Sequence, residues 1–167
     1  MKKSINILTL AAISVLAIQV ANAQSAAATQ SLNLAVNAIY KIATSGNPGA
    51  LTIITGTAGV DALTSVSDAS TTYSLTQNYA NTVKITANLD AALPGGYTLQ
   101  LNLASSKGTS AGTVDISNAT SGSAVDAVTA IGMGADANKA ITYTFSAQAS
   151  AGTLLSNSKT VTLTLTN

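Results

Sequence analysis

The chain has 167 residues, of which 47% are hydrophobic and 8% are charged, with seven basic residues against six acidic ones. It contains no Cys, His, Arg, Glu or Trp, which removes most of the side chains that enzymes use for acid–base, nucleophilic and metal chemistry. Nucleic acid is also disfavoured as a partner, because phosphate binding needs clustered cations. We therefore expect a protein that is not an enzyme, with no catalytic residues, no cofactor and no metal site.

The first residues predict a removable signal peptide over residues 1–23. Lys2 and Lys3 form a basic start, residues 5–20 are largely apolar, and residues 21–23 read Ala-Asn-Ala, a small-x-small cleavage site. Polar residues interrupt the apolar run, which favours a signal peptide over a transmembrane anchor, so we expect no transmembrane segment after cleavage. The product should be exported to the cell surface, the extracellular space or the periplasm.

Residues 24–167 are expected to form a single domain built from strands. Residues 31–42 predict a long first strand, because polar and apolar side chains alternate there with the period of two that places neighbours on opposite faces. The apolar positions of this segment are Leu32, Leu34, Val36, Ala38, Tyr40 and Ile42.

Residues 82–89 and 97–103 show the same alternation and predict two further strands. The segment between them, residues 90–96, carries Pro94 and Gly95, which suit the two central positions of a type II turn. The simplest interpretation is a hairpin in which these two strands are partners.

The second half of the chain alternates in residues 141–147 and 160–166, and shorter candidate strands lie at 51–55, 71–75 and 113–117. Residues 123–131 place apolar side chains at three-residue steps between two glycines and predict a short helical turn. About seven to eight strands, each with one apolar and one polar face, predict an all-β fold: an antiparallel immunoglobulin-like β-sandwich. Substitution of Ile85, Leu101 or Leu163 by Asp should unfold this domain.

The order of five segments, residues 31–37, 84–89, 93–99, 141–145 and 160–166, resembles that of short secreted all-β proteins of Gram-negative bacteria. It is similar in layout to fimbrial major subunits. The resemblance implies an immunoglobulin-like sandwich at the cell surface, with self-association or other cell-surface proteins as partners and assembly by strand exchange. It carries no catalytic residues.

The candidate assembly strand is residues 31–42, since Leu32, Leu34, Val36 and Tyr40 could fill a groove on a neighbouring subunit. The residues before it, 24–30, are rich in Ala and Ser and make a poor donor. The alternative is that residues 31–42 are simply the first strand of their own sheet. Both interpretations stay open at the level of the sequence.

A ladder of threonines, Thr160, Thr162, Thr164 and Thr166, is expected to lie exposed on one face of the last strand, at a spacing of nearly 7 Å if each residue rises ~3.3 Å. Such rows resemble ice-binding surfaces, which gives a minor alternative function. Threonine is also a common polar residue in ordinary strands.

A monomeric module that binds carbohydrate or another surface through its loops is a second alternative, with Tyr73 and Tyr79 as the surface aromatics. The six Asp residues are dispersed and are expected in loops or at strand ends. Asp136 and Asn138 match half of a calcium pattern, which we interpret as a turn. Ser156 and Lys159 match the S-x-x-K pattern by chance. We expect an exported structural or adhesion protein, a cell-surface or fibre subunit that assembles through strand edges.

Overall fold

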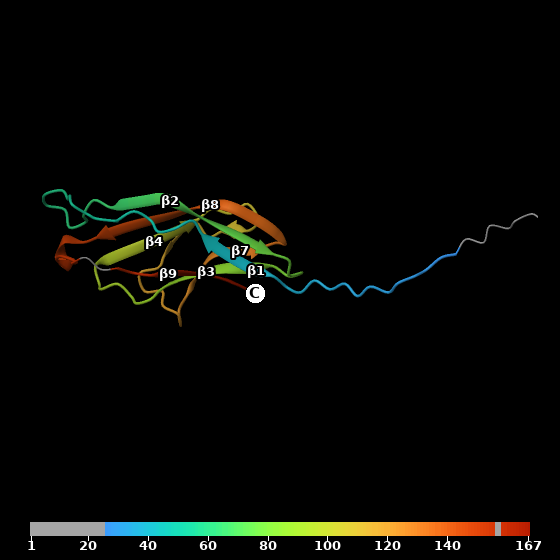
Figure 1. The fold of residues 1–167 in the computed structure, drawn as a ribbon. Helices are drawn as coiled ribbons and strands as arrows, with labels where there is room; N and C mark the ends of the chain where they lie inside the picture. The colour runs from blue at the N-terminus through green and yellow to red at the C-terminus, as the bar shows by residue number, and fades with distance from the viewer. Residues whose placement is uncertain (1–25, 156–157) are drawn as a thin grey trace, which may run out of the picture. The chain divides into compact units, whose positions relative to one another are not determined.

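The computed structural model describes residues 26–155 and 158–167, so the predicted signal peptide and its cleavage site lie outside the described residues. The chain divides into two units, one ending at Ala35 and one beginning at Val36. Residues 26–35 contain no strand and no helix. The second unit holds nine strands in its described part, and these form two antiparallel sheets packed face to face as a β-sandwich (Figure 1). The prediction of an antiparallel, all-β sandwich is confirmed.

The larger sheet has five strands in the order β1-β2-β8-β4-β6. Its strands are β1 (Tyr40–Thr44), β2 (Val66–Gln77), β8 (Gly134–Ala147), β4 (Tyr97–Leu103) and β6 (Thr113–Asp115). The smaller sheet has the order β5-β7-β3-β9. Its strands are β5 (Thr109–Ser110), β7 (Val125–Ile131), β3 (Val83–Leu89) and β9 (Val161–Thr166). A 3-10 turn, η1 (Ala149–Ala151), follows β8.

Six of the nine strands follow the order of an immunoglobulin-type sandwich, in which strands A, B, E and D form one sheet and C, F and G the other, whereas β5, β6 and β7 are additional to it. The run β1-β2-β8-β4 occupies the places of A-B-E-D, and the pair β3-β9 occupies those of C and F. The place of G, beside the outer edge of β9, holds no strand of the described chain. β9 and β1 therefore face each other across a seam at which neither edge pairs with a further strand of the described chain, and part of β1 comes within 8 Å of β9 between Cα atoms.

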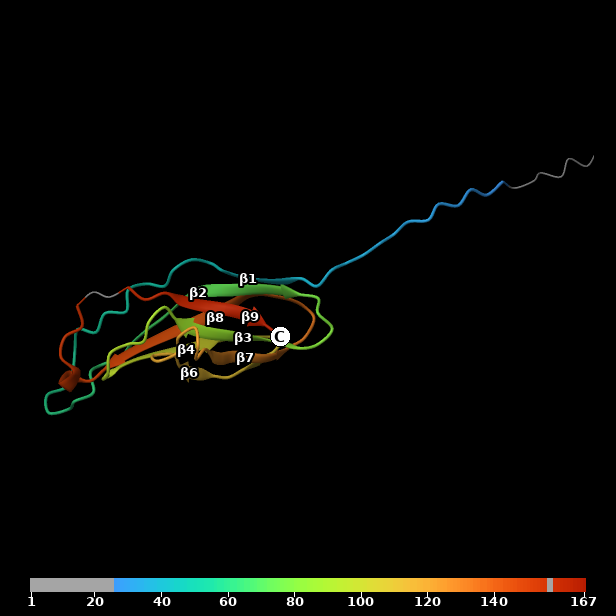
Figure 2. The same ribbon diagram turned by 90° about the horizontal axis from the view of Figure 1, so that it is seen from below.

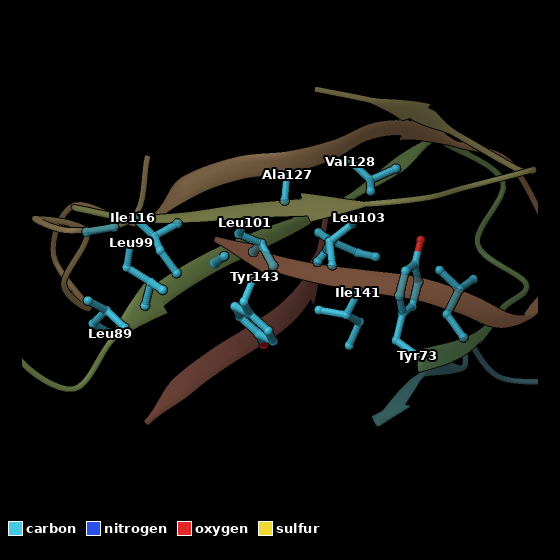
Figure 3. Close-up of a cluster of buried hydrophobic side chains, with 14 of the residues drawn as sticks. Tyr73, Leu89, Leu99, Leu101, Leu103, Ile116, Ala127, Val128, Ile141 and Tyr143 are labelled. Carbon is cyan, nitrogen blue, oxygen red and sulfur yellow. The ribbon is translucent and has the colours of Figure 1, made fainter. Parts of the chain in front are cut away.

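The core lies between the sheets and is built from the alternating positions that the sequence marks as apolar (Figure 3). In β3 and β4 every second side chain is buried, as the period of two predicts. Ile85 and Leu101 are fully buried, whereas Leu163 is only partly buried and packs at the margin of the core. Burial of each large apolar side chain contributes roughly 1.5 to 3 kcal/mol, so these inward rows hold the two sheets together.

Strands β3 and β4 are not the hairpin partners that the sequence predicts. β3 pairs with β7 and β9, while β4 pairs with β6 and β8 in the other sheet. Alternation fixes which face a side chain takes but does not fix the neighbouring strand. The connection at residues 90–96 therefore crosses between sheets instead of reversing within one.

The turn in that connection also lies one residue later than predicted. The Tyr97 amide donates to the Pro94 carbonyl at 3.4 Å, which makes Gly95 and Gly96 the central residues. Gly96 has a φ of 85°, the left-handed value that the third position of a type II turn requires.

The helical turn predicted for residues 123–131 is wrong, because this segment is the strand β7. Its register against β3 shifts twice, and Ala127 and Val128 are both buried although they are neighbours in sequence. These irregularities are β-bulges, which change the phase of a strand by one residue. They allow Val125, Val128 and Ile131, which are three residues apart, to lie on the same side of the strand. This three-residue spacing is what predicted a helical turn.

Other predicted strand boundaries also differ from those in the structure. The predicted strands at 71–75 and 141–147 are parts of the longer β2 and β8, and residues 51–55 do not form a strand. Of the predicted first strand, only residues 40–42 belong to β1, and residues 31–39 are not part of a strand. No helix in the described residues is long and apolar enough to cross a membrane.

Candidate functional site: an apolar groove along the open seam

An elongated groove runs along the open seam of the sandwich and has a volume of about 1220 Å³. One rim is formed by β1 and the connection that follows it, from Ile42 to Ile53. The other rim is formed by β9 and the described parts of the connection before it, residues 152–155 and 158–163. The described parts of these two connections thus extend the seam beyond the ends of β1 and β9.

The groove is apolar because both rims and its floor carry inward-phase side chains of the sandwich. The floor comes from β4 and β8, on which Leu99, Ile141 and Tyr143 also belong to the core. The apolar residues of the rims and ends are Ile42, Leu51, Ile53, Leu63, Leu93, Tyr97, Phe145, Leu154, Leu155, Val161 and Leu163. Burial raises the pKa of the Tyr143 hydroxyl above its usual value, as expected beside such a lining.

Each rim strand has one backbone edge without a strand partner in the described chain. Within the described chain, β9 pairs only with β3, and β1 pairs only with β2. Figure 2 shows β2 and β9 pointing toward the same end of the sandwich, and β1 is antiparallel to β2. Because β1 and β9 therefore run in opposite directions, a strand laid between them would be antiparallel to one and parallel to the other.

Leu32, Leu34 and Val36, three of the candidate assembly residues, have exposed side chains, with 78%, 85% and 82% of their surface accessible. Tyr40, the fourth, is placed differently. It begins β1, packs against the core and lies 5.6 Å from the ring of Tyr79 between centroids. Tyr40 is thus part of the sheet and packs against the core, whereas the three side chains before it are exposed.

The segment just before β1 is held by Asn78, in the connection after β2. The Asn78 side chain accepts a hydrogen bond from the Ile39 amide at 2.6 Å and donates one to the Asn37 carbonyl at 3.0 Å. Sequence reasoning did not single out Asn78, because a polar residue after a strand is common in any connection.

The predicted threonine ladder lies on β9 and beside it, with Thr162 and Thr164 exposed and Thr166 half-buried. Thr160 comes just before the strand. On the neighbouring strand β3, the partners of Thr162, Thr164 and Thr166 are Asn88, Thr86 and Lys84. The row therefore continues onto β3 at one position, Thr86, and not as a regular threonine array.

The surface aromatics expected for carbohydrate binding are placed elsewhere. Tyr73 is fully buried and its hydroxyl donates to the Ala104 carbonyl at 2.7 Å, so its prediction as a surface residue is wrong. Tyr79 is half-buried against the core beside Tyr40. Tyr73 lies on the same face of β2 as the buried Leu75, so regular alternation within the predicted strand 71–75 places it inward.

Asp136 is not in a turn, as the sequence suggested, but lies buried inside β8. Its carboxylate accepts hydrogen bonds from the Ser106 amide at 2.7 Å, the Lys107 amide at 3.2 Å and the Ser105 hydroxyl at 3.1 Å. An ion pair of 3.2 Å with Lys139 completes the cluster. Burial opposes ionisation, but these partners together hold the pKa of Asp136 below its usual value. The cluster fixes the 104–108 connection to β8.

The remaining acidic residues are dispersed. In the described part of the chain, no three acidic or other metal-ligating side chains gather at one point. Asp126 on β7 forms an exposed ion pair with Lys84 on β3 at 2.8 Å. Ser156, the first residue of the S-x-x-K match, lies outside the described residues.

Comparison of the chain with protein-family models, with curated proteins and with solved structures gave no match. The groove and the exposed segment before β1 are the features of the molecule that point to a function. The sequence pointed to the segment through its alternation. The groove could not be predicted from the sequence, because it depends on the strand order and on the absence of a described strand at the place of G.

Proposed function

We propose that this protein is an exported, non-enzymatic structural subunit of a fibre or cell-surface assembly, and that copies join by strand donation. In this arrangement the segment carrying Leu32, Leu34 and Val36 of one copy lies in the groove beside β9 of the next copy. The observation that supports the proposal most directly is a pair of complementary features in one chain. One is an apolar groove with open backbone edges, and the other is a segment with three exposed apolar side chains at alternate positions.

The dimensions of the two features match. The six residues of β9 span ~20 Å at ~3.3 Å per residue, and residues 31–37 span ~23 Å. A strand with Leu32, Leu34 and Val36 on one face would turn them toward the core and leave Asn33 and Ala35 on the outer face. The outer face of β9 is likewise polar, with Thr162 and Thr164 exposed.

Donation between copies would bury apolar side chains that a single copy leaves exposed. Burial of two leucines and one valine contributes roughly 1.5 to 3 kcal/mol for each side chain, and new backbone hydrogen bonds with β9 add to this. The ordering of an extended segment opposes these gains by roughly 1 to 2 kcal/mol per residue. The donated strand also covers an open sheet edge, which otherwise acts as a template for unspecific pairing.

An antiparallel arrangement beside β9 is the geometry we propose for the donated strand. All pairs of strands in both sheets are antiparallel, and a strand G in an immunoglobulin-type sandwich extends the C-F sheet beyond F. The predicted signal peptide provides the export that a surface assembly needs.

The test compares two aspartate variants of the full exported chain. Leu34→Asp places a charge on the face that enters the groove, whereas Asn33→Asp places the same charge on the opposite face. Light scattering over a concentration series should show oligomers for the unchanged chain and for Asn33→Asp, and monomers for Leu34→Asp. Because Leu34 is exposed in the single copy, its variant should unfold at an unchanged denaturant concentration.

A synthetic peptide of residues 26–38 supplies the second part of the test. It should bind the Leu34→Asp chain and raise its stability, since that chain has an open groove and a defective donor. A chain that stays monomeric at every concentration, and a groove that takes up no peptide, would together refute strand donation. Equal loss of assembly in both aspartate variants would also contradict it.

A further inference from the structure

Asn78 ties down the three residues through which the donor segment enters β1. Its side chain bonds the Ile39 amide and the Asn37 carbonyl, at 2.6 Å and 3.0 Å, and its backbone amide donates to the Ile39 carbonyl at 3.3 Å. The first regular pair of the ladder follows at once, between Tyr40 and Gln77. Residues 37–39 are thus paired with Asn78 as an extension of the β1–β2 ladder.

These same residues would have to form a turn if the donor segment filled the groove of its own chain. The groove lies along the other edge of β1, so the chain would have to reverse between Val36 and Tyr40. Hairpin loops most often use two to five residues, and residues 37–39 are the ones between those two positions. A reversal there breaks the pairing with Asn78, because a turn and an extended ladder cannot share three residues.

Strand direction also disfavours insertion of the donor segment into the groove of its own chain. A hairpin with β1 would run antiparallel to β1 and therefore parallel to β9. A segment from another copy carries no such connection and is free to run antiparallel to β9, which is the slightly more stable pairing. Self-insertion thus loses the Asn78 bonds and also takes the less stable direction along β9.

We infer that Asn78 determines the partner of the donor segment by directing it to a second copy of the chain. The inference rests on the proposed function and adds to it the reason why a copy does not close its own groove. The occupant is residues 31–37 of another copy. Asn78 acts here as a positioning residue, through the backbone of residues 37–39.

Disulfide trapping separates the two destinations, because the chain has no cysteine of its own. A chain with Leu34→Cys and Leu163→Cys is oxidised after export and separated without reducing agent. Closure within one chain gives a monomer, and donation gives a ladder of linked copies. The comparison is repeated with Val161→Cys and Leu165→Cys in place of Leu163→Cys, so that strand register does not decide the outcome.

In the chain with Asn78 intact, we expect the ladder to dominate. Asn78→Ala should raise the ratio of closed monomer to ladder by about tenfold, the change expected when the two side-chain hydrogen bonds are lost. Asn81→Ala, in the same connection, is the matched control and should leave the ratio unchanged. Asn78→Asp is the second variant, and it retains an acceptor for Ile39 but sets an oxygen against the Asn37 carbonyl. It should shift the ratio in the same direction.

The outcomes distinguish this inference from the proposed function. A ladder of equal strength with Asn78, with Asn78→Ala and with Asn78→Asp would overturn the role of Asn78 and leave strand donation standing. The absence of any linked copies at all three positions of β9, with no oligomers in solution, would overturn strand donation and the inference with it. If Asn78→Ala does not fold, the ratio in Asn78→Asp decides.

Discussion

Tyr97 on β4 and Phe145 on β8 stack with their ring centroids 6.3 Å apart and their planes 8° apart. Both rings line the groove. The Tyr97 hydroxyl reaches across to the carbonyls of Ala151 and Gly152, at 3.2 Å and 3.3 Å, just before the rim that leads to β9. The stack therefore forms a pre-arranged aromatic surface, and the hydroxyl ties it to one wall of the groove. A donated strand would meet this surface without first having to order it.

Phe145→Ala should weaken binding of the 26–38 peptide to the Leu34→Asp chain at least tenfold, because the variant removes one ring of the stack. The free energy of unfolding should fall by about 2 kcal/mol, less than for a fully buried phenylalanine. Isothermal titration and urea unfolding measure the two effects. Phe145→Leu keeps an apolar side chain and should retain most of the stability. An unchanged affinity in Phe145→Ala would show that the donor does not reach this end of the groove.

Tyr73→Phe should reduce the free energy of unfolding by about 1 kcal/mol, although no contact with solvent is changed. The hydroxyl is the partner of the Ala104 carbonyl at 2.7 Å, and a hydrogen bond of this kind contributes on that order. Burial raises the pKa of the Tyr73 hydroxyl, so it stays a donor at neutral pH. Urea unfolding measures the change. A stability equal to that of the unchanged chain would mean that another donor replaces the hydroxyl at Ala104.

Tyr73 also shows how far sequence reasoning reached. Alternation correctly gave the buried rows of β3 and β4, because both strands are regular and have one face in the core. It failed where bulges shift the phase, as at Val128 in β7. Tyr73 was misplaced for another reason, since its alternation with the buried Leu75 in β2 points it inward. Alternation also failed for the pairing of β3 and β4, since strand order depends on packing between sheets. The three exposed side chains before β1 could be singled out from the sequence, but the groove that would receive them could not.

Gly108→Ala should destabilise the domain by about 1 to 3 kcal/mol. A Cβ at this position would lie 2.7 Å from the Thr129 carbonyl oxygen and 2.6 Å from Cγ1 of Ile131, so β7 would have to move. Gly122→Ala is the matched control, because a Cβ there meets nothing within 4 Å and the backbone is not left-handed. Thermal unfolding of both variants gives the comparison. Similar melting temperatures would show that the 104–108 connection adjusts without cost.

Asp136→Asn should reduce the free energy of unfolding at pH 7 by about 2 to 3 kcal/mol, because it leaves Lys139 without its ion pair and weakens the bonds from the Ser106 and Lys107 amides. The effect should depend on pH. The pKa of folded Asp136 lies below that of an unfolded aspartate, ~3.9, so its ionised form stabilises the fold above that pH.

That contribution is lost as the pH falls below ~4 and through the folded pKa. Urea unfolding at pH 7 and at pH 3 should therefore show a large difference between Asp136→Asn and the unchanged chain at pH 7 and a smaller one at pH 3. Asp126→Asn breaks the ion pair with Lys84, whose two side chains are 41% and 43% exposed, and should cost less than about 1 kcal/mol. A gap for Asp136→Asn that is the same at both pH values would mean that packing around residue 136, and not its charge, holds the 104–108 connection against β8.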